Sequence, residues 1–406
     1  MLFRSVLGIN PLSILFCTCG TITGNAKKKM SNPQYYTIYL IWMIICLVFE
    51  YIPSEPYVNS KLDKIFGTHG IEIVYRISAS IAASFLLLFL CTLAWPWTHH
   101  MFMGIFFVVL LLMGWLFIWG IKSDAWIVPY RSLCRIVSFF YLVLQLMAFV
   151  DFSFTLHEMI TAKLDETNKR YKYTEKTCCC RNQWTSMYLT LSFVLCVGSI
   201  AACIAFYFIF RVNGSLCARN IIVITITLAM GILITFMCIT EKINRGFLPP
   251  AVFFAITVFY LLSALLTNSS DACNPFKNVS TFGITLINLF LNVTSGYWMA
   301  YRIRNEKVDE PDVESVQTDK KEEGTVSIPD EDSRQWCVFN FCMVLASMYL
   351  SMMCSAWYDG DIKERSSQIF DFSSPMSFWV YNSSIWIAFL VFLYILVAPM
   401  VNTNRT

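Results

Sequence analysis

Long apolar segments with few or no charged residues recur along this chain, and each is about as long as one membrane crossing. An α-helix needs about 20 mostly apolar residues to cross about 30 Å of hydrocarbon. Ten segments meet this condition: 35–52, 73–94, 101–121, 130–161, 186–210, 220–240, 247–267, 280–301, 336–356 and 376–401. Their residues are apolar on all faces, which is typical of helices in lipid. The pattern therefore predicts an all-α polytopic membrane protein with ten transmembrane helices.

Composition supports a membrane protein and argues against a soluble or nucleic-acid-binding protein. Apolar residues make up 57% of the chain and charged residues 14%, against about 25% charged in soluble domains. The net charge of +3 is spread over the loops and forms no basic stripe. We therefore expect no nucleic-acid partner.

The apolar pattern divides the chain into four parts. Residues 1–34 form an N-terminal cytoplasmic or interfacial segment, and residues 35–304 contain the first eight helices. Residues 305–335 form an acidic loop with almost no large apolar side chains, which predicts disorder because little surface can be buried. This loop is either a solvated linker or a docking tail. Residues 336–406 contain the last two helices and the C-terminal tail.

Basic residues indicate the orientation. Roughly twice as many Lys and Arg fall on the side of the N-terminus as on the other side, which favours cytoplasmic termini. The glycosylation patterns at Asn213, Asn268 and Asn278 all fall in loops assigned to the outer side.

Two groups of cysteines lie outside the apolar segments. Cys217 and Cys273 occupy two outer loops, where they either form a disulfide in an oxidising lumen or remain free thiols. Cys178, Cys179 and Cys180 lie together at a cytoplasmic membrane edge. They are candidates for S-palmitoylation, with unmodified thiols as the alternative.

Segment 130–161 has the most polar content of any predicted crossing. As one helix it would be about 48 Å long, which exceeds the hydrocarbon thickness. Charged residues inside a membrane usually face protein or water, and they often mark a pathway. We therefore interpret Arg135, Gln145, Asp151 and Glu158 as candidate lipid-binding residues. The alternative places Asp151 at headgroup level and Glu158 in water.

Motifs of soluble enzymes are missing from the sequence. It contains no glycine-rich phosphate loop, no H-E-x-x-H and no G-x-S-x-G. We therefore predict no catalytic residue, metal site or cofactor, and no enzymatic activity.

Four blocks of sequence resemble the serine incorporator family, also called TMS membrane proteins. They are QLMAFVDFSFTLHEM at 145–159, FLPPAVFFAITVFYLLSALLTNSSDACNP at 247–275, FNFCMVLASMYLSMMCSAWY at 339–358 and LVAPMVNTNR at 396–405. Their order and spacing, and the acidic loop before the third block, also resemble the family. The N-terminus differs, since it has only Cys17 and Cys19 where the family is often rich in cysteine.

The resemblance implies two bundles of helices crossed by a long diagonal helix, with a cleft beside that helix that accepts lipid. It matches Asp151 to the acidic residue of the diagonal helix and Cys273 to the cysteine of an outer loop. The implied partners are membrane phospholipids. Serine and enzymes of lipid synthesis are further candidate partners. The implied location is the plasma membrane or the secretory pathway.

The leading functional hypothesis is a protein that binds phospholipid and moves it between leaflets, affecting phosphatidylserine and sphingolipid content. The alternative is a carrier or scaffold that supplies serine for the synthesis of those lipids. A structural protein that alters lipid order, docking through residues 305–332, is a third reading.

Overall fold

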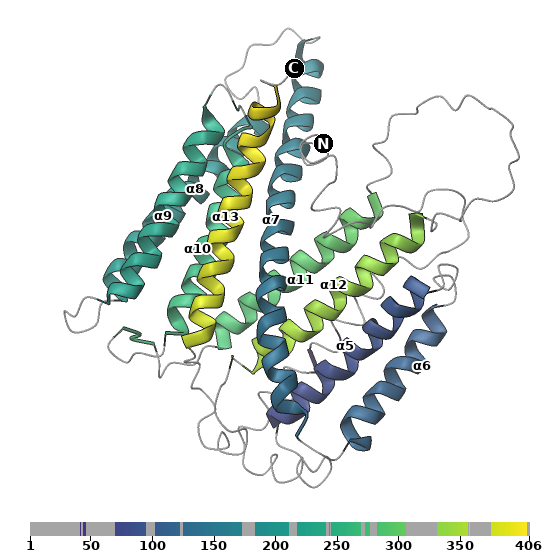
Figure 1. The fold of residues 1–406 in the computed structure, drawn as a ribbon. Coiled ribbons are helices and arrows are strands. Elements are labelled where there is room, and N and C mark those ends of the chain that lie inside the picture. Colours follow the sequence, from purple (N-terminus) through teal and green to yellow (C-terminus); the bar gives the residue numbers. More distant parts are fainter. Residues whose placement is uncertain are drawn as a thin grey trace, which may run out of the picture.

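The computed structural model describes residues 41, 44–45, 70–94, 102–121, 125–172, 183–210, 217–240, 243, 245–268, 273–276, 282–305, 331–355, 357 and 375–403. All regular elements within these residues are helices (Figure 1). They are α5 (Gly70–Ala94), α6 (Phe102–Trp115), the π-helix η3 (Leu116–Gly120), α7 (Ile127–Lys172), α8 (Gln183–Ile209), α9 (Ala218–Ile239), α10 (Leu248–Leu266), α11 (Phe282–Asn305), α12 (Glu331–Cys354) and α13 (Pro375–Thr403).

Seven helices of the described chain are long and apolar enough to cross a membrane. Their apolar parts are Glu72–Ala94, Ile127–Thr167, Trp184–Ile209, Ala218–Ile239, Leu248–Leu266, Trp336–Cys354 and Met376–Ala398. Each coincides with a predicted segment, so the polytopic helical class is confirmed. Segment 101–121 forms α6 and η3, and 280–301 lies in α11, while most of 35–52 is outside the described residues. The total of ten crossings therefore stays a prediction.

Helix α7 is longer than the apolar pattern predicts. It has 46 residues and is therefore about 69 Å long, roughly twice the thickness of the hydrocarbon layer. The predicted segment ended at residue 161, but the helix continues to Lys172. Hydropathy marks where a helix leaves the hydrocarbon, whereas helix-forming residues such as Ala, Lys, Leu and Glu continue it into water.

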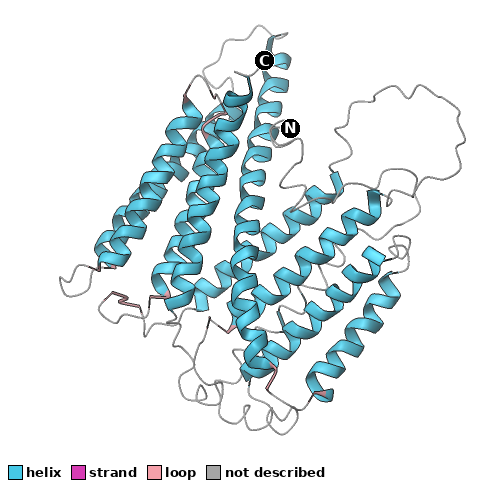
Figure 2. Cartoon of the chain, viewed as in Figure 1, coloured by secondary structure: helices cyan, strands magenta, loops and turns pink. Residues whose placement is uncertain are grey.

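Two groups of helices flank α7. Figure 1 shows a first group, α8, α9, α10 and α13, on one side of α7. A second group, α5, α6, α11 and α12, is inclined on the other side. Helix α7 packs against α8, α10 and α13 of the first group and against α5, α11 and α12 of the second. Helices make up nearly all of the described chain in Figure 2, and its few described loop residues lie next to helix ends. Of the seven apolar helices, α12 is the most buried and α8 the least.

Aromatic rings connect α7 to the first group. The ring of Phe154 on α7 stacks on Phe392 of α13 with centroids 5.5 Å apart. Phe253 of α10 in turn stacks on Phe392 at 4.9 Å and meets Phe389 edge-on at 5.3 Å. Offset and edge-to-face rings at these distances add about 0.5–1.5 kcal/mol per pair beyond their buried area.

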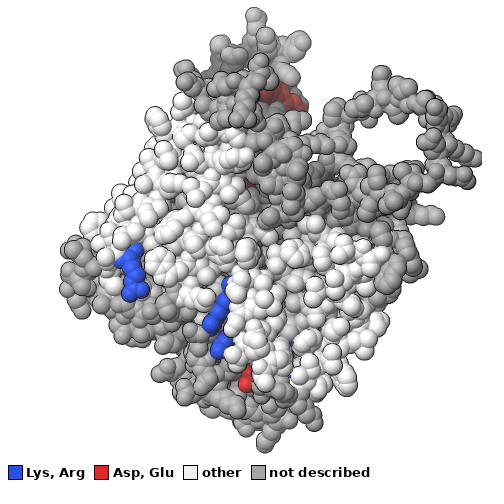
Figure 3. All heavy atoms as spheres, viewed as in Figure 1, with Lys and Arg blue, Asp and Glu red and all other residues white. Residues whose placement is uncertain are grey.

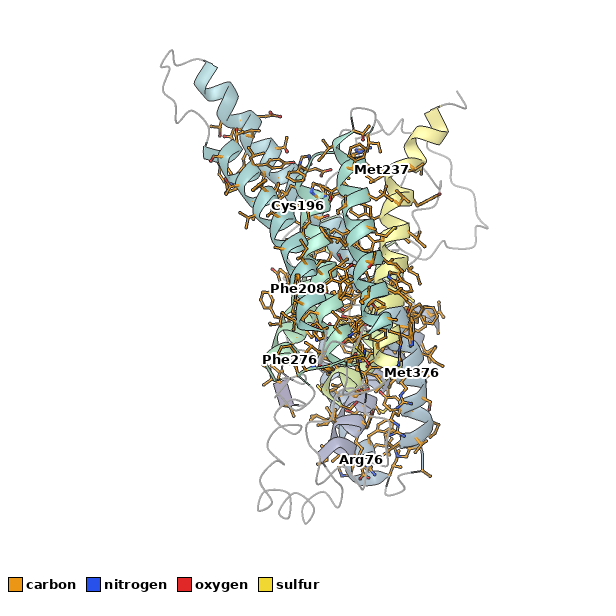
Figure 4. The ribbon with its side chains drawn as sticks, turned by 90° about the vertical axis from the view of Figure 1, so that its left-hand side faces the viewer. Arg76, Cys196, Phe208, Met237, Phe276 and Met376 are labelled. Atoms are coloured by element: carbon orange, nitrogen blue, oxygen red, sulfur yellow. A yellow bond between two sulfur atoms is a disulfide. The ribbon has the colours of Figure 1, made fainter. Side chains whose placement is uncertain are left out.

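In the second group of helices, Arg76 of α5 contacts the end of η3 (Figure 4). Its side chain is 1% exposed, and its Nη1 donates to the carbonyl oxygens of Phe117 at 2.8 Å and Ile121 at 2.6 Å. Carbonyl groups at the end of a helix lack partners within the helix and attract a positive charge. The guanidinium also lies 5.8 Å from the ring centre of Trp126. This intramembrane arginine therefore has a structural role.

Serine residues permit close packing of α5 on α12. The Ser78 hydroxyl lies 2.7 Å from the backbone oxygen of Ser347 and donates to it, and the Tyr75 hydroxyl donates to Ser355 at 2.9 Å. Small and hydroxyl-bearing residues have this role at helix interfaces in membranes.

A glycine substitution tests the contact between α9 and α10. A Cβ added at Gly231 would overlap the buried ring of Phe254, so Gly231→Ala forces the two helices apart. We expect a loss of about 1–3 kcal/mol in stability, measured as a lower melting temperature in detergent. Gly198 is the matched control, because an added Cβ meets nothing within 4 Å. Gly198→Ala should be neutral or stabilising, and equal melting temperatures for the two variants would contradict the packing.

Candidate functional site

Asp151 lies on α7 within the apolar part of the helix and is partly exposed. The indole Nε1–H of Trp298, on α11, donates to its Oδ2 atom at 3.1 Å. The neighbouring Phe152 ring meets the Trp298 ring edge-on, with centroids 5.0 Å apart. A carboxylate inside a membrane is costly and needs a polar partner. The structure meets this need with an aromatic donor from the second group of helices.

Asp151 belongs to a polar stripe on α7, formed by Asp151, Thr155 and Glu158. Positions that are four and seven residues apart lie on one face of a helix. Asp151 and Thr155 are partly exposed, and Glu158 is exposed. The stripe covers about 10 Å along the helix axis. We did not include Thr155 among the predicted residues, although its spacing from Asp151 was visible in the sequence.

Arg135 does not join this stripe. It precedes Asp151 by 16 positions, which places it about 24 Å along the axis and about 160° around the helix. It lies one turn from Arg131, and both side chains are partly exposed. Figure 3 shows basic atoms toward the lower end of α7 with acidic atoms below them, and further acidic atoms near the upper end of the molecule. The predicted lipid-binding residues therefore do not form one continuous track.

Gln145 is enclosed by the protein. Its side chain is 0% exposed, so no lipid touches it in this conformation. Neither Nε2 nor Oε1 has a hydrogen-bond partner among the described residues. One turn earlier, the Tyr141 hydroxyl donates to Oδ1 of Asn292 at 2.6 Å, and its ring packs on Tyr349 at 5.0 Å. From the sequence, Gln145 is interpreted as lipid-binding because it is polar and lies in an apolar segment. In the structure, its face of α7 points into the packed interior.

A second polar junction connects α7, α8 and the start of α10. The Tyr188 hydroxyl accepts the backbone N–H groups of Phe247 at 3.1 Å and Leu248 at 3.2 Å. Gly246 has a φ of +85°, and an added Cβ would lie 2.5 Å from the His157 ring. The residues after Leu248 are two prolines without N–H groups. The first turn of α10 therefore presents no N–H to an anion.

At the opposite end of the helices, a disulfide joins Cys217, at the start of α9, to Cys273, and the two Cα atoms are 5.6 Å apart. Beside it, Nδ2 of Asn220 donates to the backbone oxygen of Cys273 at 3.0 Å. Nδ2 of Asn268 donates to Oδ1 of Asn220 at 2.8 Å. Of the two alternatives for these cysteines, the structure therefore contains the disulfide and not the free thiols.

This network argues against one predicted glycosylation site. Asn268 is only 4% exposed, and the amide nitrogen that would carry the glycan is hydrogen-bonded. The sequence pattern cannot report this burial. The other predicted modification sites lie outside the described residues: Asn213, Asn278, Cys178, Cys179 and Cys180. Within the described part of the chain, no group of three or more His, Cys, Asp or Glu side chains could hold a metal ion.

Comparisons with known proteins agree on one family. The sequence model of the family described as Serine incorporator (Serinc) matches residues 10–328 and 293–405. "Serine incorporator 2" of Mus musculus is 22% identical over 70% of this chain and 68% of that protein. "Probable serine incorporator" of Nematostella vectensis is 23% identical over 95% of this chain and 93% of that protein. "Serine incorporator 2" of Bos taurus is 22% identical over 97% of both.

Replacing Gln145 tests whether its buried amide is unpartnered. Gln145→Met keeps the length of the side chain and removes two buried polar atoms that lack hydrogen-bond partners among the described residues. We expect stability to rise by about 1–3 kcal/mol, measured by thermal unfolding in detergent. Asn292→Leu is the control, because it removes the acceptor of the Tyr141 hydroxyl and should destabilise the protein. A lower melting temperature for Gln145→Met would show that the amide has a bound partner.

Removing the sequon at Asn268 tests its burial. Ser270→Ala abolishes the Asn268-Ser-Ser pattern and leaves the Asn268 side chain in place. Because the amide is buried, we expect no change in the glycosidase-sensitive electrophoretic mobility of the protein from cells. Ser215→Ala and Ser280→Ala remove the patterns at Asn213 and Asn278 and serve as comparisons. Loss of one glycan on Ser270→Ala would contradict the buried position.

Proposed function

Because the chain belongs to the serine incorporator family of membrane proteins, we propose that it binds phospholipid headgroups beside α7 and lets them cross between leaflets. This scramblase-like activity would change the phosphatidylserine and sphingolipid content of the leaflets. The observation that carries the proposal is the partly exposed Asp151 carboxylate within an apolar helix, hydrogen-bonded to Trp298.

A polar stripe answers the main physical obstacle to lipid crossing. A headgroup that enters hydrocarbon loses its hydration, and each unpaired polar group costs several kcal/mol. Asp151, Thr155 and Glu158 offer polar atoms at intervals of about one turn, with increasing exposure toward the C-terminal end of α7. The stripe supports entry of a headgroup from the leaflet at that end as far as Asp151.

The geometry changes which residues carry the proposal. Asp151 and Glu158 remain, Thr155 is added, and the enclosed Gln145 is removed. Arg135 and Arg131 form a separate basic contact near the other leaflet, where guanidinium groups suit a lipid phosphate. They lie on the opposite face of α7 from the stripe, so a crossing lipid must also move around the helix.

The proposed orientation places both termini in the cytoplasm. The Cys217–Cys273 disulfide supports this orientation, because disulfides persist in oxidising compartments and the two cysteines occupy predicted outer loops. The protein would lie in the plasma membrane or the secretory pathway. We assign it no reaction, catalytic residue or cofactor.

The serine-carrier alternative would need a site for a zwitterion, with an anion and a cation a few ångströms apart. On α7, Asp151 and Arg135 are about 24 Å apart. No specific observation therefore favours this alternative. Saturable serine binding would be the result that restores it.

Neutralising Asp151 tests the proposed function. Purified protein in vesicles should accelerate exchange of a fluorescent phospholipid between leaflets. Asp151→Asn keeps an acceptor oxygen for Trp298 but removes the charge, so we expect exchange to slow about tenfold, or about 1.4 kcal/mol. Asp165→Asn is the matched control on an exposed position of the same helix. Equal rates for the wild type and Asp151→Asn would refute the assignment of this site.

A further inference from the structure

We propose that the contact between α7 and α11 opens to water, and that Gln145 is the side chain that binds this water. The opening supplies the step around α7 that a crossing headgroup needs, and in this respect it rests on the proposed function. Water entry is nevertheless a property of the protein that can be measured without any lipid movement.

Protein encloses α7 on all faces over about two turns. Residues 144–150 are all buried. Seven consecutive residues of a helix point in all directions around its axis, so no face of this enclosed segment is open to lipid. Asp151 just after the segment and Arg135 before it are both partly exposed. A headgroup that passes between these two regions along α7 therefore needs neighbouring helices to separate.

Gln145 is the polar residue of the enclosed segment, whose sequence is LQLMAFV. Its side chain is 0% exposed, and neither Nε2 nor Oε1 has a hydrogen-bond partner among the described residues. Buried polar groups in proteins nearly always have such a partner, and one without it destabilises the fold. An amide both donates and accepts hydrogen bonds, as water does. Gln145 therefore stabilises an open, hydrated conformation relative to the closed one.

Polar side chains of α11 border the enclosed segment. Asn292, Ser295 and Trp298 follow one another at intervals of three residues, along one side of α11. The Tyr141 hydroxyl donates to Asn292 at 2.6 Å before the segment, and Trp298 donates to Asp151 at 3.1 Å after it. Ser295 lies between these contacts on α11 and is 0% exposed. Because water can replace hydrogen bonds at a small net cost, this contact separates more readily than one of interlocked apolar side chains.

Thiol labelling tests whether the contact opens. Ser295→Cys places a thiol on α11, and Ser347→Cys is the matched control between α5 and α12. Both serines are 0% exposed and donate to their own helix, at the backbone oxygens of Asn292 and Met343. A charged maleimide reacts with the thiolate, which forms where water reaches the sulfur. In nanodiscs of the full chain, peptide mass spectrometry should find labelling about tenfold faster at position 295 than at position 347.

Two variants of α7 shift the opening in opposite directions. Gln145→Met removes the side chain that gains from water, so labelling of Ser295→Cys should slow about fivefold while the melting temperature rises. Tyr141→Phe keeps the ring but removes the hydroxyl that bonds to Asn292, so labelling should become severalfold faster while the melting temperature falls. Gly231→Ala destabilises the contact between α9 and α10 instead, and labelling at position 295 should stay unchanged.

Equal labelling at positions 295 and 347 would show that the contact stays closed, and would overturn the inference. Labelling at position 295 that Gln145→Met leaves unchanged would overturn the role of Gln145. Failure of the proposed function has a different result. If position 295 is labelled as expected but lipid exchange in vesicles is not accelerated, the opening stands and the scramblase-like activity does not. If exchange is fast and both positions are labelled equally, the activity stands and the opening does not.

Discussion

Helices in a bilayer gain little from burying apolar side chains against one another, because lipid tails are equally apolar. Close packing and hydrogen bonds between helices must therefore hold such a protein together. Here both kinds of contact meet on α7, whose Phe154 stacks on α13 and whose Tyr141 bonds to α11 and packs on α12. A helix of 46 residues is long enough to contact both groups at different levels.

The same arrangement creates the candidate site. Because the two groups are inclined to each other, α7 cannot be covered along its whole length by both of them. Toward its C-terminal end, the face of α7 with Asp151, Thr155 and Glu158 is only partly covered, and Trp298 of α11 contacts Asp151 there. Asp151 is thus held by one group while its side chain still reaches the surface. A carboxylate that is held by a hydrogen bond and is still partly exposed is what a transient headgroup contact requires.

Hydropathy predicted the positions of the helices well, because the cost of polar residues in hydrocarbon acts on each segment separately. It predicted side-chain environments poorly, since these depend on which face of a helix meets a neighbour. Gln145 and Asp151 looked equivalent in the sequence, but Gln145 is enclosed and Asp151 is not. Counting 100° per residue would have separated Arg135 from Asp151. The burial of Asn268 and the bonds of Arg76 to helix η3 depend on tertiary contacts that no local pattern contains.

A density map of the protein in lipid nanodiscs tests the central claim most directly, namely that headgroups contact the stripe on α7. The account predicts a lipid headgroup beside Trp298, with a polar atom within hydrogen-bond or ion-pair distance of the Asp151 carboxylate. Continuous acyl-chain density along Asp151, Thr155 and Glu158, with every headgroup at the two membrane surfaces, would contradict it.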